Sequence, residues 1–228
     1  MPRRRRPGLP GIPLHVVQRG VNRSACFLVD GDRERYLHWL AEAAALHACS
    51  IHAYVLMGNH VHLLMTPETD TAASRVMHAL GTRYVAYFNR RHGRTGVLWE
   101  RRFRACLVDT DSYLLRCHRY IELNPVRARM VVHPSEYRWS SYRHYASGFP
   151  DRVLSPHSLV VALAQDEAGL RRAYRSLCAD HEDDWSALRR ESERCGAFGG
   201  DEFRRRVAGH PGFSDLDRTR GRPATRGK

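Results

Sequence analysis

The sequence contains no C-x-x-C pair, although it has six cysteines, at positions 26, 49, 106, 117, 178 and 195. Without such a pair, the sequence favours neither a zinc ribbon nor a dithiol redox motif. It also has no apolar run near the roughly 20 residues that a membrane helix needs. The basic N-terminus is not followed by the apolar segment of a signal peptide. We therefore expect a cytoplasmic protein with reduced thiols.

Lysine is nearly absent, because Lys228 is the only one. Lys and Arg together nevertheless outnumber Asp and Glu by 37 to 24, for a net charge of +13, so almost all of the positive charge is arginine. Such a balance favours a polyanionic partner, and the planar arginine fork binds phosphate oxygens in pairs. Genome base composition can also enrich arginine, so the charge alone does not identify the partner.

Two β-rich runs, 51–57 and 60–66, are separated only by Gly58 and Asn59. This pair predicts a hairpin in which Gly58 supplies the positive φ of a type II′ turn. Because side chains alternate along a strand, His60 and His62 share one face and form a natural metal-binding pair. An isolated His-x-His is more often two histidines at a half-exposed sheet edge, so this spacing alone does not establish a metal site.

Tyr120 and Asn124 are four residues apart in a predicted helix over 109–124, with Thr110 or Asp111 as its N-cap. They are therefore neighbours on one helix face, about 5–6 Å apart at Cβ. Taken alone, Tyr120 is predicted to be a half-buried packing residue. A phenol with a pKa of about 10 needs a nearby cation or base to act as a nucleophile.

The predicted element order is β-α-β-β-α-β-α. It comprises a strand at 14–19, a helix at 32–48, the hairpin, a helix at 71–91, a strand region at 97–108 and the helix at 109–124. The first six elements give an α+β, ferredoxin-like antiparallel sheet with two helices on one face. The Tyr120 helix can then cover the other face.

The chain is predicted to divide into four parts. They are a basic arm at 1–13, a catalytic domain at 14–132, a helical C-terminal extension at 133–212 and a basic disordered tail at 213–228. Within the extension, 155–179, 183–195 and 201–208 are expected to be helices. Aromatic residues of 133–146, beginning with Tyr137, are expected to pack back onto the main domain.

Spaced motifs run in a fixed order from about His15 to Tyr145. They are Gln18-Arg19-Gly20, His60-Val61-His62, Tyr87 to Gly93, Leu98 to Phe103, Tyr120 to Arg127, and Tyr137 to Tyr142. Together they resemble the single-tyrosine transposases of the HUH class, and in particular the REP-associated tyrosine transposases. The family's turn usually has Pro where this chain has Gly58. Asn124 precedes Pro125, which disfavours helical geometry at Asn124.

The resemblance implies the same fold and a role for each site residue. His60, His62 and Asn124 would hold Mg²⁺ or Mn²⁺, although imidazoles alone also suit zinc. Tyr120 would attack the scissile phosphodiester and form a 5′-phosphotyrosine. The implied partner is a single-stranded DNA hairpin, the REP element, with a 5′ guide tetranucleotide. The implied setting is a monomer associated with the nucleoid.

Basic residues interleaved with an aromatic suit single-stranded nucleic acid. The predicted DNA contacts of this kind are Arg19, Asn22, Arg23, Trp99, Arg101, Arg102 and Arg104. Core packing is the alternative for Trp99. In the tail, Arg220-Gly221-Arg222-Pro223 matches the core of an AT-hook, whose arginines enter the minor groove. An ordinary solvated basic tail is the alternative.

Two other functions remain open at this point. The first is a hairpin-binding protein with the same fold and basic surface but without catalysis. The second is an RNA-processing nuclease that uses His60 and His62 as acid and base, without a metal and without a covalent adduct.

Overall fold

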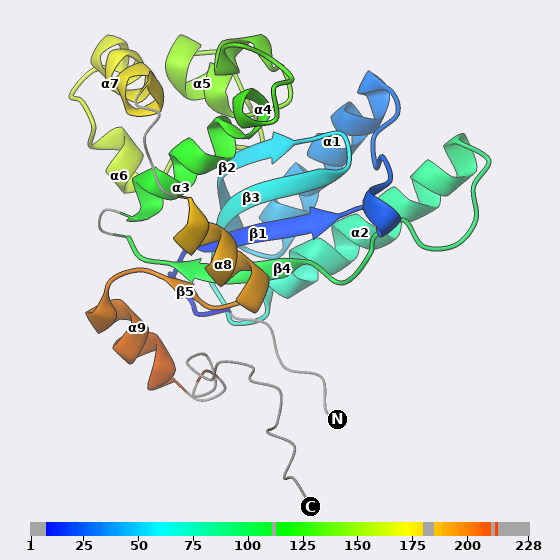
Figure 1. Cartoon of the computed structure of the whole chain (residues 1–228), viewed down its shortest axis with the longest axis horizontal. Coiled ribbons are helices and arrows are strands. Elements are labelled where there is room, and N and C mark those ends of the chain that lie inside the picture. Colours follow the sequence, from blue (N-terminus) through cyan, green and yellow to red (C-terminus); the bar gives the residue numbers. More distant parts are fainter. Residues whose placement is uncertain (1–7, 111–112, 180–184, 211–212, 214–228) are drawn as a thin grey trace, which may run out of the picture.

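A five-stranded sheet with the strand order β2-β3-β1-β4-β5 forms the centre of the molecule (Figure 1). The computed structural model describes residues 8–110, 113–179, 185–210 and 213, so Asp111, Arg220 and Arg222 lie outside the described residues. The strands are β1 (Leu14–Arg19), β2 (Cys49–Leu56), β3 (His60–Pro67), β4 (Arg104–Val108) and β5 (Ala197–Phe198). The neighbours β2-β3, β3-β1 and β1-β4 are antiparallel, whereas β5 pairs with β4 in parallel. The α+β prediction is confirmed, and β5 makes the sheet mixed.

Helices cover both faces of this sheet (Figure 1). They are α1 (Asp30–Leu46), α2 (Ala72–Arg91), α3 (Tyr113–Glu122), α4 (Asn124–Arg127), α5 (Tyr142–Ser147), α6 (Ser158–Val161), α7 (Glu167–Ala179), α8 (Ser186–Arg194) and α9 (Asp201–Ala208). Two short 3-10 helices, Val21–Arg23 and Pro134–Glu136, complete the described elements. None of the helices in the described part of the chain combines the length and apolar content needed to cross a bilayer.

Alternation along β1 sorts its side chains between the two faces. Leu14 and Val16 are fully buried on the face that carries α1 and α2. His15 and Val17 point to the opposite face, where Val17 is paired with His62 on β3 and with Arg104 on β4. The second face therefore gathers histidines and arginines beneath α3 and α8.

Several predicted boundaries were wrong. The predicted helix at 109–124 is α3 up to Glu122 followed by α4 from Asn124, because Pro125 lacks the N–H that would continue the helix. The strand region at 97–108 contains only β4, preceded by an isolated bridge between Gly20 and Trp99. The helix predicted at 32–48 is α1, which begins at Asp30 and ends at Leu46, a residue that is 76% exposed.

The extension also differs from the prediction in its helix ends. The region 155–179 is divided into α6 and α7, because the Asp166 carboxylate accepts a hydrogen bond from the Gly169 N–H at 2.6 Å and caps a new helix start. Helix α8 ends where Cys195 adopts the left-handed conformation, with φ 57°. Helix α9 has the predicted bounds.

The hairpin prediction is confirmed, but its turn type was wrong. Gly58 does not have a positive φ, and Met57, Gly58 and Asn59 separate the two strands. The Gly58 and Asn59 carbonyls accept hydrogen bonds from the N–H groups of Cys26 and Gly20, each at 2.9 Å. These tertiary bonds hold the turn, so a strained glycine conformation is unnecessary.

The outer edge of β2 is covered by the segment that follows α4. The aromatic side chains expected there are all buried: Tyr137, Trp139, Tyr142 and Tyr145. The Leu56 N–H donates to the Trp139 carbonyl at 2.8 Å, and the Tyr137 hydroxyl donates to the Leu56 carbonyl at 2.7 Å. An edge strand with its polar groups bonded in this way does not pair with other chains.

Glu122, at the end of α3, carries a fully buried carboxyl group. Its Oε1 accepts hydrogen bonds from Ser141 Oγ at 2.5 Å and from the Tyr174 hydroxyl at 3.0 Å. Burial raises the pKa of Glu122 from 4.5 to about 8, against the opposing effect of these hydrogen bonds. The protonated carboxyl therefore stabilises the fold fully below pH 4.5, and this contribution is lost as the pH rises towards about 8.

We expect Glu122→Gln to flatten this pH dependence, since an amide keeps the acceptor and never ionises. Relative to the native chain, the variant should gain roughly 1.4 kcal/mol of unfolding free energy per pH unit across that window. Urea unfolding at pH 5, 6.5 and 8 measures the difference. Glu202→Gln, at an exposed position on α9, is the control. An equal difference at pH 5 and pH 8 would contradict the raised pKa.

Candidate active site

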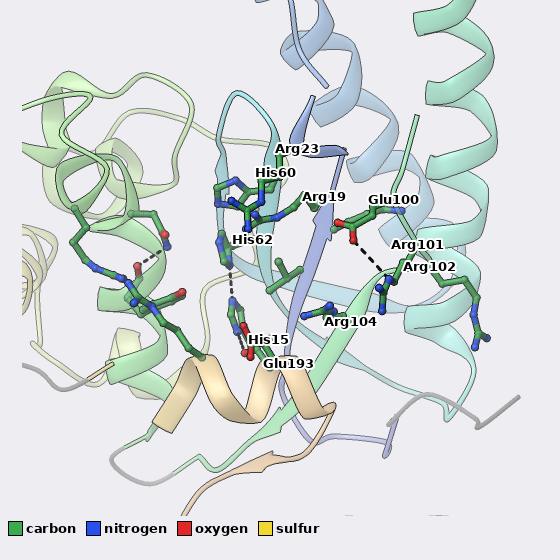
Figure 2. A pocket seen from close by; sticks show the side chains of 17 residues that line it. His15, Arg19, Arg23, His60, His62, Glu100, Arg101, Arg102, Arg104 and Glu193 are labelled. Carbon is green, nitrogen blue, oxygen red and sulfur yellow. Dashed lines mark hydrogen bonds and ion pairs between the residues drawn. The ribbon is translucent and has the colours of Figure 1, made fainter. Parts of the chain in front are cut away.

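A cleft of about 490 Å³ lies on the face of the sheet opposite α1 and α2 (Figure 2). It brings together nine of the predicted site residues: Arg19, Arg23, His60, His62, Arg101, Arg102, Arg104, Tyr120 and Asn124. These residues come from β1, β3, β4, α3, α4, the 3-10 helix Val21–Arg23 and the loop before β4. Segments more than 100 residues apart therefore converge on one cavity.

His60 is held by its neighbour in the turn. The Asn59 amide nitrogen donates to the Arg23 carbonyl at 3.1 Å, so the Asn59 amide oxygen faces His60 Nδ1, 2.7 Å away. Nδ1 must then carry the proton, which leaves the Nε2 lone pair free. Burial, and secondarily the charge of Arg19, lowers the pKa of His60 to about 4. The ring is neutral at pH 7.

His62 is only 5% exposed, because β3 is an interior strand. The expectation of a half-exposed sheet edge was therefore wrong. His62 Nδ1 lies 2.9 Å from His15 Nε2, and its ring centroid is 5.0 Å from that of His60. Burial lowers the pKa of His62 well below its usual value, and the nearby His15, His60 and arginines add to this effect.

Asn124 remains in the cleft although α3 ends two residues earlier. Its amide nitrogen donates to the Tyr120 carbonyl at 2.8 Å, so the amide oxygen is left as an acceptor. In the described residues, no group of three or more His, Cys, Asp or Glu side chains could hold a metal ion. The implied ligands are instead two imidazoles and one amide oxygen, and His60, His62 and Asn124 each have their other polar atom bonded elsewhere. This donor set fits a divalent ion that keeps open coordination positions.

Tyr120 is 6% exposed and sits among cations and rings. Its ring meets the His62 ring edge-to-face, with 5.6 Å between the two centroids. The centroid of the Trp185 ring lies 5.4 Å from that of Tyr120. The Arg127 guanidinium lies 4.7 Å from the ring centroid. Burial raises the pKa of Tyr120, and a hydrogen bond and the charge of Arg189 partly offset that rise.

Arginine dominates the charge of the cleft. Figure 2 shows Arg19 and Arg23 beside His60, and Arg101, Arg102 and Arg104 on the side of the cleft away from the histidines. Arg127 and Arg189 line it as well, against two carboxylates, Glu100 and Glu193. A concave surface with an excess of positive charge concentrates and orients a polyanion such as a phosphodiester strand.

The model of the IS200-like transposase family matches residues 10–124, slightly more than half of the sequence. The chain belongs to the IS200-like transposase family. No curated protein matches it significantly. Among solved structures, the REP-associated tyrosine transposase bound to a REP hairpin is similar to it, with a TM-score of 0.52 and 20% identity over 69% of this chain and 93% of that chain. At this identity the likeness shows the fold.

Two other solved structures align less well. A candidate transposase from Deinococcus radiodurans gives a TM-score of 0.36 and 20% identity over 57% of this chain and 92% of that chain. The tRNA(His) guanylyltransferase of Saccharomyces cerevisiae gives a TM-score of 0.40 and 10% identity over 76% and 80%. Neither supports an argument about this transposase.

Two predicted DNA contacts of the transposase do not line the cleft. Trp99 packs against Tyr84, with ring centroids 6.0 Å apart and planes 29° apart, and against Tyr36. The structure therefore supports the core-packing alternative for Trp99. Asn22 lies in the 3-10 helix after β1, in the left-handed conformation with φ 50°, and is exposed.

The cleft also contains residues that the sequence analysis missed: His15, Arg127, Arg189, Ser192 and Glu193. Alternation along β1 could have placed His15 on the face of the histidine pair, once β1 was known to lie beside β3. Arg127 lies within a motif already noted. Helix α8 supplies the other three, and no sequence signal connects it with a site some 70 residues earlier in the transposase.

Proposed function

We propose that this transposase nicks single-stranded DNA at REP-type hairpins, preceded by a guide tetranucleotide, and transfers the strand through a phosphotyrosine on Tyr120. The observation that supports this proposal best is the meeting of Tyr120, His60, His62 and Asn124 in one arginine-rich cleft. A nucleophile, a set of free metal-ligand atoms and a phosphate-binding surface are the three components that the reaction needs.

In the proposed reaction, the Tyr120 hydroxyl oxygen attacks phosphorus. An O–P bond to Tyr120 forms, the bond from phosphorus to the 3′ oxygen breaks, and that oxygen takes up a proton to leave as a 3′-hydroxyl. The phenolic proton is lost to solvent or to a neighbouring base. The 5′-phosphotyrosine is still a phosphodiester, so a second 3′-hydroxyl can reverse the step and join another strand without ATP.

The residues of the cleft support the reaction electrostatically. A divalent ion, Mg²⁺ or Mn²⁺, would be held by His60, His62 and Asn124, and when bound it supplies polarisation of the scissile phosphate. The Arg189 hydrogen bond favours the ionised phenol and opposes the effect of burial. The remaining arginines bind the phosphates on either side of the scissile bond.

Tyr120 contacts the histidine pair of its own chain, with its ring 5.6 Å from that of His62. A tyrosine donated by a second subunit is therefore unnecessary, and this favours a monomer. We expect the transposase to act in the cytoplasm, on DNA of the nucleoid.

The low histidine pKa values argue against the RNA-nuclease alternative. Acid–base cleavage needs one imidazole that is protonated near neutral pH. Burial lowers the pKa of His60 to about 4 and that of His62 well below its usual value. At pH 7 neither ring carries the proton that a general acid must donate.

The test uses a single-stranded hairpin labelled at either end, incubated with the full chain in Mg²⁺, Mn²⁺ or excess chelator. After denaturing electrophoresis, we expect the 3′-labelled strand to migrate with the protein and the 5′-labelled strand to appear as a shortened free fragment. Both products should require the divalent ion. Cleavage in excess chelator without an adduct would favour the RNA-processing nuclease. Hairpin binding without cleavage would favour the non-catalytic hairpin-binding protein.

The basic tail gives a separate prediction. Residues 218–228 carry Arg218, Arg220, Arg222, Arg226 and Lys228. Deleting 214–228, which retains the buried Phe213, should weaken hairpin binding and flatten its salt dependence by roughly 0.7 in the log–log slope per lost phosphate contact. Cleavage at saturating DNA should stay nearly unchanged. Binding titrations over roughly 50 to 200 mM salt determine the slope.

A variant with the same arginines replaced by serine is the control for tail length. If the arginines enter a minor groove as an AT-hook does, the loss should be greater for A·T-rich stems than for G·C-rich stems. An unchanged affinity and slope after deletion would contradict the prediction. Loss of cleavage on saturated DNA would instead show that the tail contributes to the active site.

A further inference from the structure

A chain of hydrogen bonds connects His62 with helix α8 beneath the cleft. His62 Nδ1 lies 2.9 Å from His15 Nε2, and His15 Nδ1 lies 2.9 Å from Ser192 Oγ. All three residues are buried, with exposures of 5%, 1% and 6%. The two imidazole planes are within 5° of parallel. Figure 2 shows His15 between His62 and the orange-tan helix α8.

His15 is not itself placed to be a ligand. Both of its ring nitrogens are bonded, one to His62 and the other to Ser192. His15, His60 and His62 also do not form a three-residue metal group. Burying an imidazole is unfavourable unless both nitrogens are bonded. The structure therefore places at His15 a ring whose two nitrogens are bonded to His62 and Ser192 and which meets the Tyr120 ring edge-to-face, 5.6 Å between centroids.

The hydrogen-bond chain has two possible proton orders when both rings are neutral. In one, His62 Nδ1–H donates to His15 Nε2, and His15 Nδ1–H donates to Ser192. In the other, Ser192 donates to His15, His15 donates to His62, and His62 Nε2 carries a proton. Because the bonds are consecutive, fixing one tautomer fixes the other.

The charge of the cleft selects the first order. Arg19 and Arg189 lie close enough to His62 to act on it electrostatically. A guanidinium repels an N–H and attracts a lone pair, so the unprotonated Nε2 is favoured on the cleft side. His60 has the same arrangement, with Nδ1–H bonded to Asn59 and Nε2 free.

We infer that His15 and Ser192 are positioning residues that hold His62 in the Nδ1–H tautomer, with its Nε2 lone pair directed into the cleft. This inference rests on the proposed function, in which His62 presents a preformed nitrogen ligand to the divalent ion. Ser192 lies outside residues 10–124, which the family model matches. The C-terminal extension thus supports a ligand of the histidine pair through His15.

The test reads the tautomer of His62 directly, by ¹⁵N NMR of the histidine rings in the metal-free full chain. We expect the native protein to show Nδ1–H at His62. His15→Phe removes the acceptor and should give a mixture of tautomers. It should also weaken Mn²⁺ binding, measured by calorimetry, by roughly 10-fold or more. Ser192→Ala should weaken binding by a smaller factor.

His15→Gln is the matched rescue, because a glutamine amide oxygen reaches the position of Nε2 and can accept from His62. It should restore both the tautomer and Mn²⁺ affinity to near the native values. A native His62 with its proton on Nε2 would overturn the inference, as would His15→Phe with unchanged tautomer and unchanged affinity. If no form binds Mn²⁺ but the tautomer shift occurs, the inference stands and metal dependence of the proposed function fails.

Discussion

Replacing Tyr120 with phenylalanine is expected to abolish DNA cleavage and the covalent protein–DNA adduct, with a loss of at least roughly 10³-fold in rate. The substitution removes only the phenolic oxygen. The ring keeps its packing against His62 and Trp185 and its place beneath the Arg127 guanidinium. Hairpin affinity should therefore stay within a few-fold of the native value. The measurements are denaturing electrophoresis for the adduct and a binding titration for affinity.

Tyr113→Phe is the matched control, since Tyr113 is on the same helix but away from the cleft residues. Its ring packs on that of Phe198, with 4.8 Å between the two centroids. We expect it to cleave normally. A denaturant-resistant adduct in the Tyr120→Phe variant would show that another residue is the nucleophile. A large loss of hairpin binding in that variant would assign Tyr120 to DNA binding as well.

The position of the Tyr120 helix could be predicted because local patterns determine it. The Gly58-Asn59 break and the alternation of His60 and His62 define a hairpin, and an amphipathic α3 must cover one face of the sheet. Ile121 and Cys117 are buried against that sheet. Once α1 and α2 occupy one face, α3 is left with the face of the histidines.

The contribution of α8 could not be predicted in the same way. Its sequence shows an ordinary short helix, and nothing in it indicates which surface it covers. Trp185 packs on Tyr120, and Ser192 bonds His15. Both contacts depend on where the chain returns after α7, which is set by the parallel pairing of β5 with β4. A two-residue strand such as Ala197–Phe198 is too short to show the apolar–polar alternation by which a strand is predicted from sequence.

The turn at Gly58 shows a second limit of local reasoning. Its dipeptide matches a type II′ turn, but the loop lies against the segment after β1, and Gly20 and Cys26 bond its carbonyls. Tertiary hydrogen bonds can therefore set a loop conformation that the dipeptide preference does not describe. The same segment orients Asn59, and through it His60.

His60→Ala and His62→Ala should each abolish metal-dependent cleavage, since either change leaves one imidazole for the divalent ion. They should differ in stability. His60 is partly buried and bonds its neighbour Asn59, whereas His62 is buried and bonds His15. His62→Ala leaves His15 Nε2 unpaired inside the protein, at a cost of about 1–3 kcal/mol in unfolding free energy. Cleavage assays and urea unfolding of both variants measure these two effects.

The control is His38→Ala, which changes a histidine on α1 whose side chain is 58% exposed and pairs with Glu42 at the surface. It should change neither cleavage nor stability appreciably. Full activity in either active-site variant, or native cleavage in excess chelator, would contradict the proposed metal-assisted chemistry. Equal stability of the two active-site variants would contradict the structural role of the His15–His62 bond, because His62→Ala leaves the buried His15 ring without this hydrogen-bond partner and His60→Ala does not.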